Sequence, residues 1–101
     1  DTGVGDDTIS RLALQQNSPN PFSPSTTIAY SVPRSARVEL KVYGVGGRLV
    51  RTLVDQEKAP GRYSATWDGR NEAGGEAAAG IYFYRLLADG EELARKMILL
   101  R

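Results

Sequence analysis

The feature that most limits how this chain can fold is an alternation of apolar and polar residues that stops and restarts along almost its whole length. About seven such stretches follow one another at roughly ten-residue intervals, and each is bounded by residues that favour turns. A period of two places neighbouring side chains on opposite faces of a strand, and no stretch makes a convincing helix. The sequence therefore predicts an all-β fold.

In each predicted strand, one set of alternate residues is apolar and is expected to face the core. The members of these sets are Leu12, Leu14, Ile28, Tyr30, Val32, Val38, Leu40, Val42, Tyr63, Ala65, Trp67, Tyr82, Tyr84 and Leu86. Trp67 is the only tryptophan, and we expect it at the centre of the core because a large ring in an inward position buries the most area. Short strands at this spacing are typical of two packed sheets, so we predict an immunoglobulin-like (fibronectin III-like) β-sandwich of about seven antiparallel strands.

Residues with marked turn preferences separate the predicted strands. Pro33 ends one strand, and the short segment "PRSA" fits a hairpin-type connection to the next strand. Asp89 and Gly90 form the strongest hairpin signal in the chain. The segment 48–54, "RLVRTLV", fits helical spacing as well as strand spacing, and we interpret it as a strand with an irregularity.

The composition limits the chemistry that is open to the chain. Its 101 residues are enough for one domain, and because residues 1–8 are small, polar and acidic, we interpret them as a linker ahead of a domain at 9–101. There is no cysteine and no histidine, which excludes a thiol nucleophile, a histidine-based triad and a Cys or His metal site. The net charge is +1 without a basic stripe, and the apolar runs are short. We therefore expect no enzyme activity, no cofactor, no nucleic acid partner and no membrane insertion.

Two weaker binding hypotheses rest on single features of the sequence. The loop "WDGRNEAGGEAAAG" offers Asp68, Asn71 and Glu72 as oxygen ligands for calcium, but it lacks the dense acidic alternation of calcium loops. The sequence favours a turn in which Asp68 is the cap and Gly69 takes a positive φ. Glycan binding is the second hypothesis, since Tyr43 and Phe83 fall on outward faces and could form an aromatic platform.

The segment "NSPNPFSPS" places three prolines around one of the two phenylalanines of the chain. Proline fixes φ and donates no hydrogen bond, so this segment is predicted to be a preset arm that leads into the next strand. Phe22 either plugs the open end of the core or lies exposed as a docking epitope. We favour the plug, because Pro21 and Pro24 would hold the ring in place at a low entropic cost.

Several stretches together resemble a known family. "SPNPFSPSTTIAYSVP", "VELKVYGVGGRLVRTLV", "PGRYSATWDGRNEAGGEAAAGIYFYRL" and "ARKMILLR" are similar, in order and spacing, to the FlgD-type Ig-like domain. The resemblance covers about residues 12–101. It implies a domain of the flagellar hook-capping protein that also occurs as a terminal module on bacterial secreted proteins. There it overlaps the C-terminal sorting domains of the type IX (Por) secretion pathway.

The resemblance implies a non-catalytic C-terminal module of a larger exported bacterial protein. Such a module would act as a secretion or sorting signal or as a cell-surface attachment, and its protein would be secreted or held at the cell surface after passing through the periplasm. The expected partners are the secretion machinery or other domains of the parent protein, and the isolated domain is expected to be monomeric. The alternative is a structural spacer or assembly module, as in the hook cap, and a carbohydrate-binding module is a third possibility.

The last predicted strand, "ARKMILLR", is the expected recognition element. An edge strand offers unpaired backbone groups to another protein, although an ordinary core strand with charged ends would have the same sequence pattern. The residues expected to contact a partner are Arg95, Lys96, Met97, Leu99 and Arg101.

Overall fold

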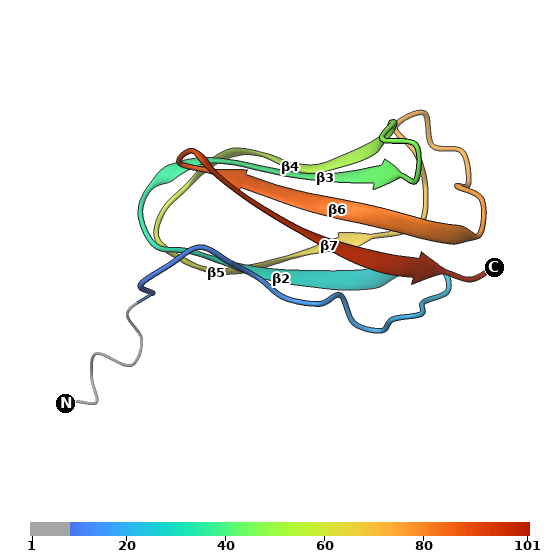
Figure 1. Ribbon diagram of the computed structural model, residues 1–101, viewed down its shortest axis with the longest axis horizontal. Helices are drawn as coiled ribbons and strands as arrows, with labels where there is room; N and C mark the ends of the chain where they lie inside the picture. The colour runs from blue at the N-terminus through green and yellow to red at the C-terminus, as the bar shows by residue number, and fades with distance from the viewer. Residues whose placement is uncertain (1–8) are drawn as a thin grey trace.

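The computed structural model describes residues 9–101, and the proposed linker, residues 1–8, lies outside the described part. Seven strands make two antiparallel sheets, which face each other in Figure 1. The strands are β1 (Ala13–Leu14), β2 (Thr26–Val32), β3 (Ala36–Gly44), β4 (Leu49–Lys58), β5 (Gly61–Trp67), β6 (Gly80–Ala88) and β7 (Glu91–Leu99). One sheet has the order β1-β2-β5 and the other the order β4-β3-β6-β7. The structure thus confirms the all-β sandwich, and no helix occurs within residues 9–101.

The alternation in the sequence determines which side of each strand is buried. Every second residue is buried along most of β2, β3 and β6, which places the core between the two sheets. The central residues expected in the core are buried, namely Phe22, Tyr30, Leu40, Trp67, Tyr82 and Tyr84. Tyr63 and Ala65 of β5, which the alternation also predicts to face the core, are only partly buried. The ring of Trp67 has no exposed surface and contacts the rings of Phe22 and Tyr82, at centroid distances of 5.7 Å and 5.2 Å.

The strand β4 contains the irregularity that the sequence predicts for residues 48–54. Its pairing with β3 shifts by one residue at two places, which leaves Val50 and Leu53 as additional residues in β4. A bulge adds one residue and increases the local twist. The two extra residues explain why the apolar positions of this segment do not follow a strict period of two.

The predicted hairpin at "PRSA" is wrong, because residues 33–35 connect strands of different sheets. β2 already has β1 and β5 as neighbours, whereas β3 lies between β4 and β6, so neither strand has a free edge for the other. The short connection therefore crosses the end of the sandwich. The hairpin predicted at Asp89 and Gly90 does form between β6 and β7, with positive φ values of 52° and 80°.

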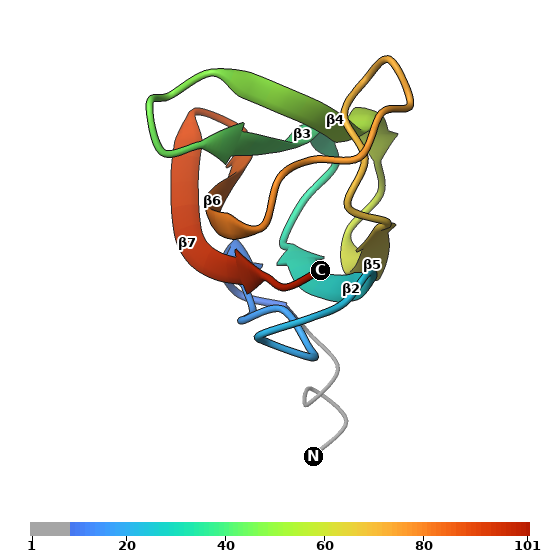
Figure 2. The ribbon, with the colours of Figure 1, turned by 90° about the vertical axis from the view of Figure 1, so that its right-hand side faces the viewer.

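The strands β1 and β7 form the edges of the two sheets on one side of the sandwich. Figure 2 looks along the sandwich and shows the end of β7 close to β2 and to the segment that precedes it. The contacts between this segment and β7 are described next.

Candidate functional site

The last strand is an edge strand, and a segment from the start of the domain pairs with its final part. We call residues 15–25 the arm. The main-chain N–H of Phe22 donates to the carbonyl of Ile98 at 3.0 Å, and the N–H of Leu100 donates to the carbonyl of Phe22 at 2.7 Å. These two bonds form a parallel bridge between Phe22 and Leu99. The arm therefore acts as one short strand beside the end of β7.

Two polar side chains of the arm extend this pairing. The N–H of Ile98 donates to Asn20 Oδ1 at 3.0 Å, and Gln16 Nε2 donates to the carbonyl of Lys96 at 2.8 Å. Amide side chains thus satisfy backbone groups of β7, with Asn20 as the acceptor and Gln16 as the donor. The backbone and side chains of the arm together bind the backbone groups of Lys96, Ile98 and Leu100 that point away from β6.

A buried polar cluster fixes the start of the arm to the four-stranded sheet. The hydroxyl of Tyr84 accepts a bond from the N–H of Asn17 at 2.8 Å and donates to the carbonyl of Gln15 at 2.7 Å. The Asn17 side chain donates to the Pro19 carbonyl at 3.1 Å and to Thr26 Oγ1 at 3.0 Å. Burial raises the pKa of Tyr84, although the bond from Asn17 opposes this effect.

The sequence pattern predicts Tyr84 only as a core residue and does not indicate this cluster. A signal was nevertheless available, because the hydroxyl of an inward-facing tyrosine usually finds a hydrogen-bond partner. The sequence does not say that the partner is the backbone of the arm, because Asn17 lies 67 residues away along the chain.

The ring of Phe22 closes the end of the core. Only 1% of the residue is exposed, and its ring lies against Trp67. A docking epitope requires an exposed ring, so the buried position agrees with the plug.

The five residues expected to recognise a partner divide into two groups. Met97 and Leu99 are 0% and 1% exposed, because β7 alternates like the other strands and turns these side chains into the core. Their side chains are therefore inaccessible at the surface, contrary to the expected role. Lys96, in contrast, is exposed on the outer face.

Arg95 and Arg101 are exposed residues whose guanidinium groups bind backbone carbonyls of the domain itself. Arg95 Nε donates to the carbonyl of Leu14 at 2.6 Å, which links β7 to β1. Arg101 donates to the carbonyls of Ala77 and Gly69, at 3.0 Å and 2.6 Å. Both arginines thus hold parts of the fold together.

In the loop between β5 and β6, the side-chain oxygens of the three candidate calcium ligands accept hydrogen bonds from different backbone N–H groups. Asp68 Oδ1 accepts a bond from the N–H of Arg70 at 3.1 Å, which forms the predicted turn around Gly69, whose φ is 78°. Asn71 Oδ1 accepts bonds from two loop N–H groups, and Glu72 Oε2 accepts one from the N–H of Thr52 in β4 at 2.6 Å. Within residues 9–101, no three acidic side chains lie together as a metal-binding group.

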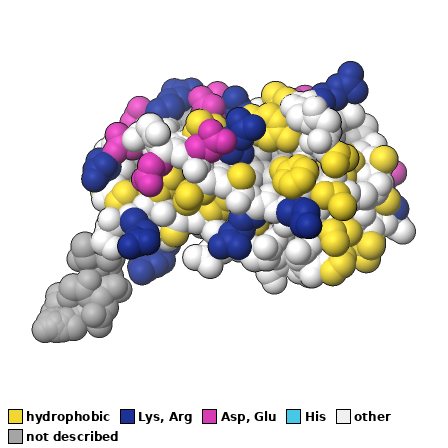
Figure 3. All heavy atoms as spheres, viewed as in Figure 1, with side chains coloured by type: hydrophobic (Ala, Val, Ile, Leu, Met, Phe, Trp, Pro, Cys, Tyr) yellow, Lys and Arg dark blue, Asp and Glu magenta, His cyan; other side chains and the backbone are white. Residues whose placement is uncertain are grey.

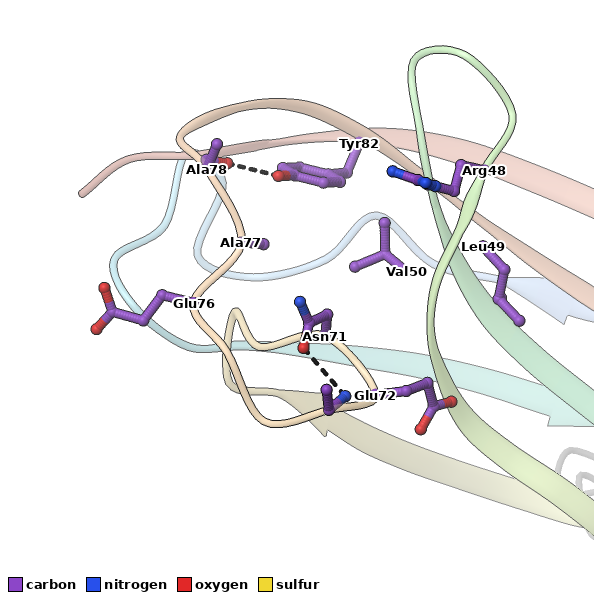
Figure 4. Close-up of a pocket in the computed structure, with 10 residues that line it drawn as sticks. Arg48, Leu49, Val50, Asn71, Glu72, Glu76, Ala77, Ala78 and Tyr82 are labelled. Atoms are coloured by element: carbon purple, nitrogen blue, oxygen red, sulfur yellow. Dashed lines mark hydrogen bonds between the residues drawn. The ribbon is translucent and has the colours of Figure 1, made fainter.

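A hollow of about 410 Å³ lies between this loop and the start of β4, as Figure 4 shows. Val50, Ala77 and Tyr82 supply apolar surface, and the Tyr82 hydroxyl donates to the carbonyl of Ala78 at 2.5 Å. Glu76 points away from the hollow in Figure 4. Arg48, Glu72 and Glu76 point in different directions in Figure 4, so the charged groups around this hollow lie apart.

The outer face of the four-stranded sheet carries the two rings considered for glycan binding. Tyr43 and Phe83 are directly opposite each other on β3 and β6, and Phe83 is 37% exposed. The guanidinium of Arg85 lies 4.6 Å from the centre of the Tyr43 ring, so a cation already covers that ring. On the face shown in Figure 3, hydrophobic side chains gather toward the right-hand end of the view and most of the visible acidic side chains lie toward the upper left.

No helix within the described part of the chain has the length and hydrophobicity that a bilayer crossing requires.

Three solved structures are similar to this chain in fold. A dimeric latent PorU from Porphyromonas gingivalis is 23% identical, with a TM-score of 0.71 over 91% of this chain and 10% of that protein. FlgD from P. aeruginosa is 24% identical, with a TM-score of 0.59 over 74% of this chain and 60% of FlgD. PorZ, described as an essential surface component of the type-IX secretion system of P. gingivalis, is 18% identical, with a TM-score of 0.58 over 99% of this chain and 13% of PorZ.

The chain spans less than two thirds of each of these three proteins, and at such identities the likeness concerns the fold. No curated protein matches the sequence. The model of the FlgD Ig-like domain family matches residues 20–92, from the arm to the start of β7. The chain therefore belongs to the FlgD Ig-like domain family.

Proposed function

We propose that this domain is a non-catalytic module of a larger exported bacterial protein, and that the secretion machinery recognises it after it has folded. The parent protein is then secreted or attached to the cell surface after crossing the periplasm. Similarity in fold to PorU and PorZ supports this proposal, because PorZ is described as an essential surface component of the type-IX secretion system.

The observation that carries the proposal is the position of β7. This strand lies at a sheet edge, its end is bound by the arm, and its outer face presents Lys96. Because Met97 and Leu99 belong to the core, the strand keeps this form only in the folded domain. A partner that binds β7 therefore recognises the surface of the folded domain and not an extended tail.

A reporter fusion tests the sorting proposal. The full chain, placed behind a periplasm-directed reporter, is expected to carry the reporter across the outer membrane of a host with the type IX pathway. The same fusion in a host without that pathway is the control and should stay in the periplasm. Retention of the fusion in the competent host would mean that the sorting proposal is wrong.

Single substitutions locate the residues that the secretion machinery recognises better than a truncation does. Removing "KMILLR" would take Met97 and Leu99 out of the core and unfold the domain. Lys96→Ser instead changes one exposed side chain, and Arg62→Ser changes an exposed cation on β5 of the other sheet. Export is expected to fall for Lys96→Ser and not for Arg62→Ser, while both variants melt like the wild type.

The second candidate is a structural spacer or assembly module. It is supported by the similarity to FlgD, in which the matched region makes up 60% of the chain. A spacer holds neighbouring domains in position and is not recognised by the secretion machinery. It would leave the fusion in the periplasm and would make export of the parent protein independent of Lys96.

A further inference from the structure

The free edge of β7, which points away from β6, has two halves. The arm binds the backbone groups of one half, which we call closed, and leaves those of the other half, from Glu91 to Arg95, open. Lys96, Ile98 and Leu100 direct such groups toward the arm. Because the direction of backbone groups alternates along a strand, Glu92 and Ala94 face the same way. Within the described part of the chain, their outward N–H and carbonyl groups have no hydrogen-bond partner, and no strand pairs with β7 on that side, where β1 lies across the seam between the sheets.

A hollow of about 290 Å³ borders the open half. Its walls are residues 13–15, at and after β1, and residues 93–95 of β7, so it lies at the seam between the two sheets. Arg95 bridges this seam through its bond to Leu14. The small side chain of Ala94 leaves the edge accessible, and Ala94 is exposed.

The charges along the open half are separated by sign. Glu91 and Glu92 lie at its start, where the Glu92 carboxylate pairs with Arg85 of β6 at 3.1 Å, and Arg95 and Lys96 lie at its end. A strand that adds antiparallel to β7 matches these charges if it carries an acidic side chain opposite Lys96 and a basic one opposite Glu92.

A second copy of the chain fits this edge less well than a different protein does. Symmetric pairing about Ala94 would place residues 89 and 90 of the second copy, the turn into its β6, opposite residues 99 and 98 of β7, where the arm already lies. A short segment of another protein can leave the edge at Lys96. Symmetric pairing about Leu93 would set Glu91 against Arg95, whose guanidinium is bound to β1.

We infer that β7 from Glu91 to Arg95 is a strand-addition site for an extended segment of a partner protein. The arm already adds to the same edge further along, in the parallel direction. The partner adds antiparallel to the part of the edge that the arm leaves open. Backbone pairing supplies affinity and the separated charges fix the register. The inference rests on the proposed function, since it names the kind of partner segment that would read β7 during export.

The first test is a peptide titration into the ¹⁵N-labelled full chain. The probe is acetyl-Thr-Glu-Val-Thr-Val-Lys-Thr-amide, whose Glu lies opposite Lys96 and whose Lys lies opposite Glu92 in the antiparallel register. Saturable shifts of the Glu92 and Ala94 amide resonances are expected, together with slower exchange of the Ala94 N–H. Absence of saturable shifts there, or a dimer of the chain without peptide, would overturn the inference.

Two modified peptides separate backbone pairing from nonspecific contact. N-methylation of the central threonine removes the N–H that faces Ala94, and binding is expected to weaken about tenfold. Exchanging the Glu and Lys of the peptide should also weaken binding. Equal affinity of the N-methylated and unmodified peptides would overturn the inference.

Substitutions at Ala94 provide the matched test in the protein. Ala94→Pro removes an outward N–H that makes no bond in the fold, and an edge strand tolerates proline in this orientation. Ala94→Ser keeps the N–H and is the control. Peptide binding should be lost only in Ala94→Pro, and retained binding by a folded Ala94→Pro contradicts strand addition. If Ala94→Pro does not fold, the N-methylated peptide on the wild type decides the question.

The reporter fusion separates failure of this inference from failure of the proposed function. A wild-type fusion that is not exported refutes the proposed function without affecting the peptide result. Normal export of a folded Ala94→Pro fusion, alongside reduced export of Lys96→Ser, would keep the sorting function and overturn strand addition.

Discussion

At Gly69 the backbone φ is 78°, and a Cβ atom there would lie 2.9 Å from the carbonyl oxygen of Pro24. Gly74 has a similar φ of 90°, but a Cβ atom at that position would meet nothing within 4 Å. The positive φ favours glycine at both positions, but only at Gly69 would a Cβ atom also collide with a neighbouring backbone atom. The sequence indicates the positive φ at Gly69, but it gives no sign of the contact with the arm.

We predict that Gly69→Ala destabilises the domain by at least about 1 kcal/mol more than Gly74→Ala does, because only the first change forces a steric overlap. Urea unfolding followed by circular dichroism measures both free energies of unfolding. Equal losses for the two variants would mean that the arm does not approach the loop as closely as described.

Trp67 packs against Phe22 and Tyr82, and its Nε1 donates to the carbonyl of Arg70 at 2.9 Å. Trp67→Ala should therefore lower the free energy of unfolding by about 3–5 kcal/mol, a large part of the stability of a small domain. Circular dichroism is the suitable probe, since the variant has no tryptophan fluorescence. An unchanged melting temperature would contradict the placement of Trp67 at the core.

Among the elements, the arm and β7 illustrate what the sequence does and does not predict. Alternation predicts that β2, β3 and β6 are strands and which of their faces are buried. It does not predict that β2 and β3 belong to different sheets, because the alternating pattern is the same for a hairpin and for a crossover. The arm has no such pattern, and its partner β7 lies at the far end of the sequence.

The anchor of the arm gives a prediction at this scale. Tyr84→Phe removes the hydroxyl that satisfies Asn17 and Gln15, which leaves the buried N–H of Asn17 and the partly buried carbonyl of Gln15 without this partner. The expected loss is about 1–3 kcal/mol. Tyr63→Phe is the control, because the Tyr63 hydroxyl donates to the carbonyl of Ala59 at an exposed site, and it should cost no more than about 0.5 kcal/mol. A similar loss in both variants would contradict the anchoring role of Tyr84.

At the scale of the whole molecule, two buried tyrosines link stability to pH. Burial raises the pKa of Tyr30 and of Tyr84 above the ordinary value of 10.0, and the nearby Tyr63 adds to the effect at Tyr30. Above about pH 10 the unfolded chain loses these protons while the folded domain retains them, so stability is intact below that pH and falls as the pH rises through the folded-state pKa.

Urea unfolding between about pH 8 and about pH 11 measures the free energy of unfolding and checks this prediction. The decrease in this free energy should be smaller in Tyr84→Phe than in the wild type. A wild-type stability that stays constant or rises over this range would contradict the burial of the two hydroxyl groups.

The recognition residues are the part of the site that sequence reasoning predicts least well. It identifies the last strand, but it does not separate Lys96, which is exposed, from Met97 and Leu99, which are in the core. Which side of an edge strand faces the core depends on its register with β6, and the part of its edge that stays open depends on the arm.

The most direct test of the account is residue-resolved hydrogen exchange along β7 in the free domain. We predict slow exchange for the N–H groups of Ile98 and Leu100, which bind Asn20 and Phe22, and fast exchange for Ala94. Asn20→Ala should accelerate exchange at Ile98 and leave Ala94 unchanged. Uniform protection along β7, or fast exchange at Ile98 and Leu100, would contradict the division of this edge into a half closed by the arm and a half open to a partner.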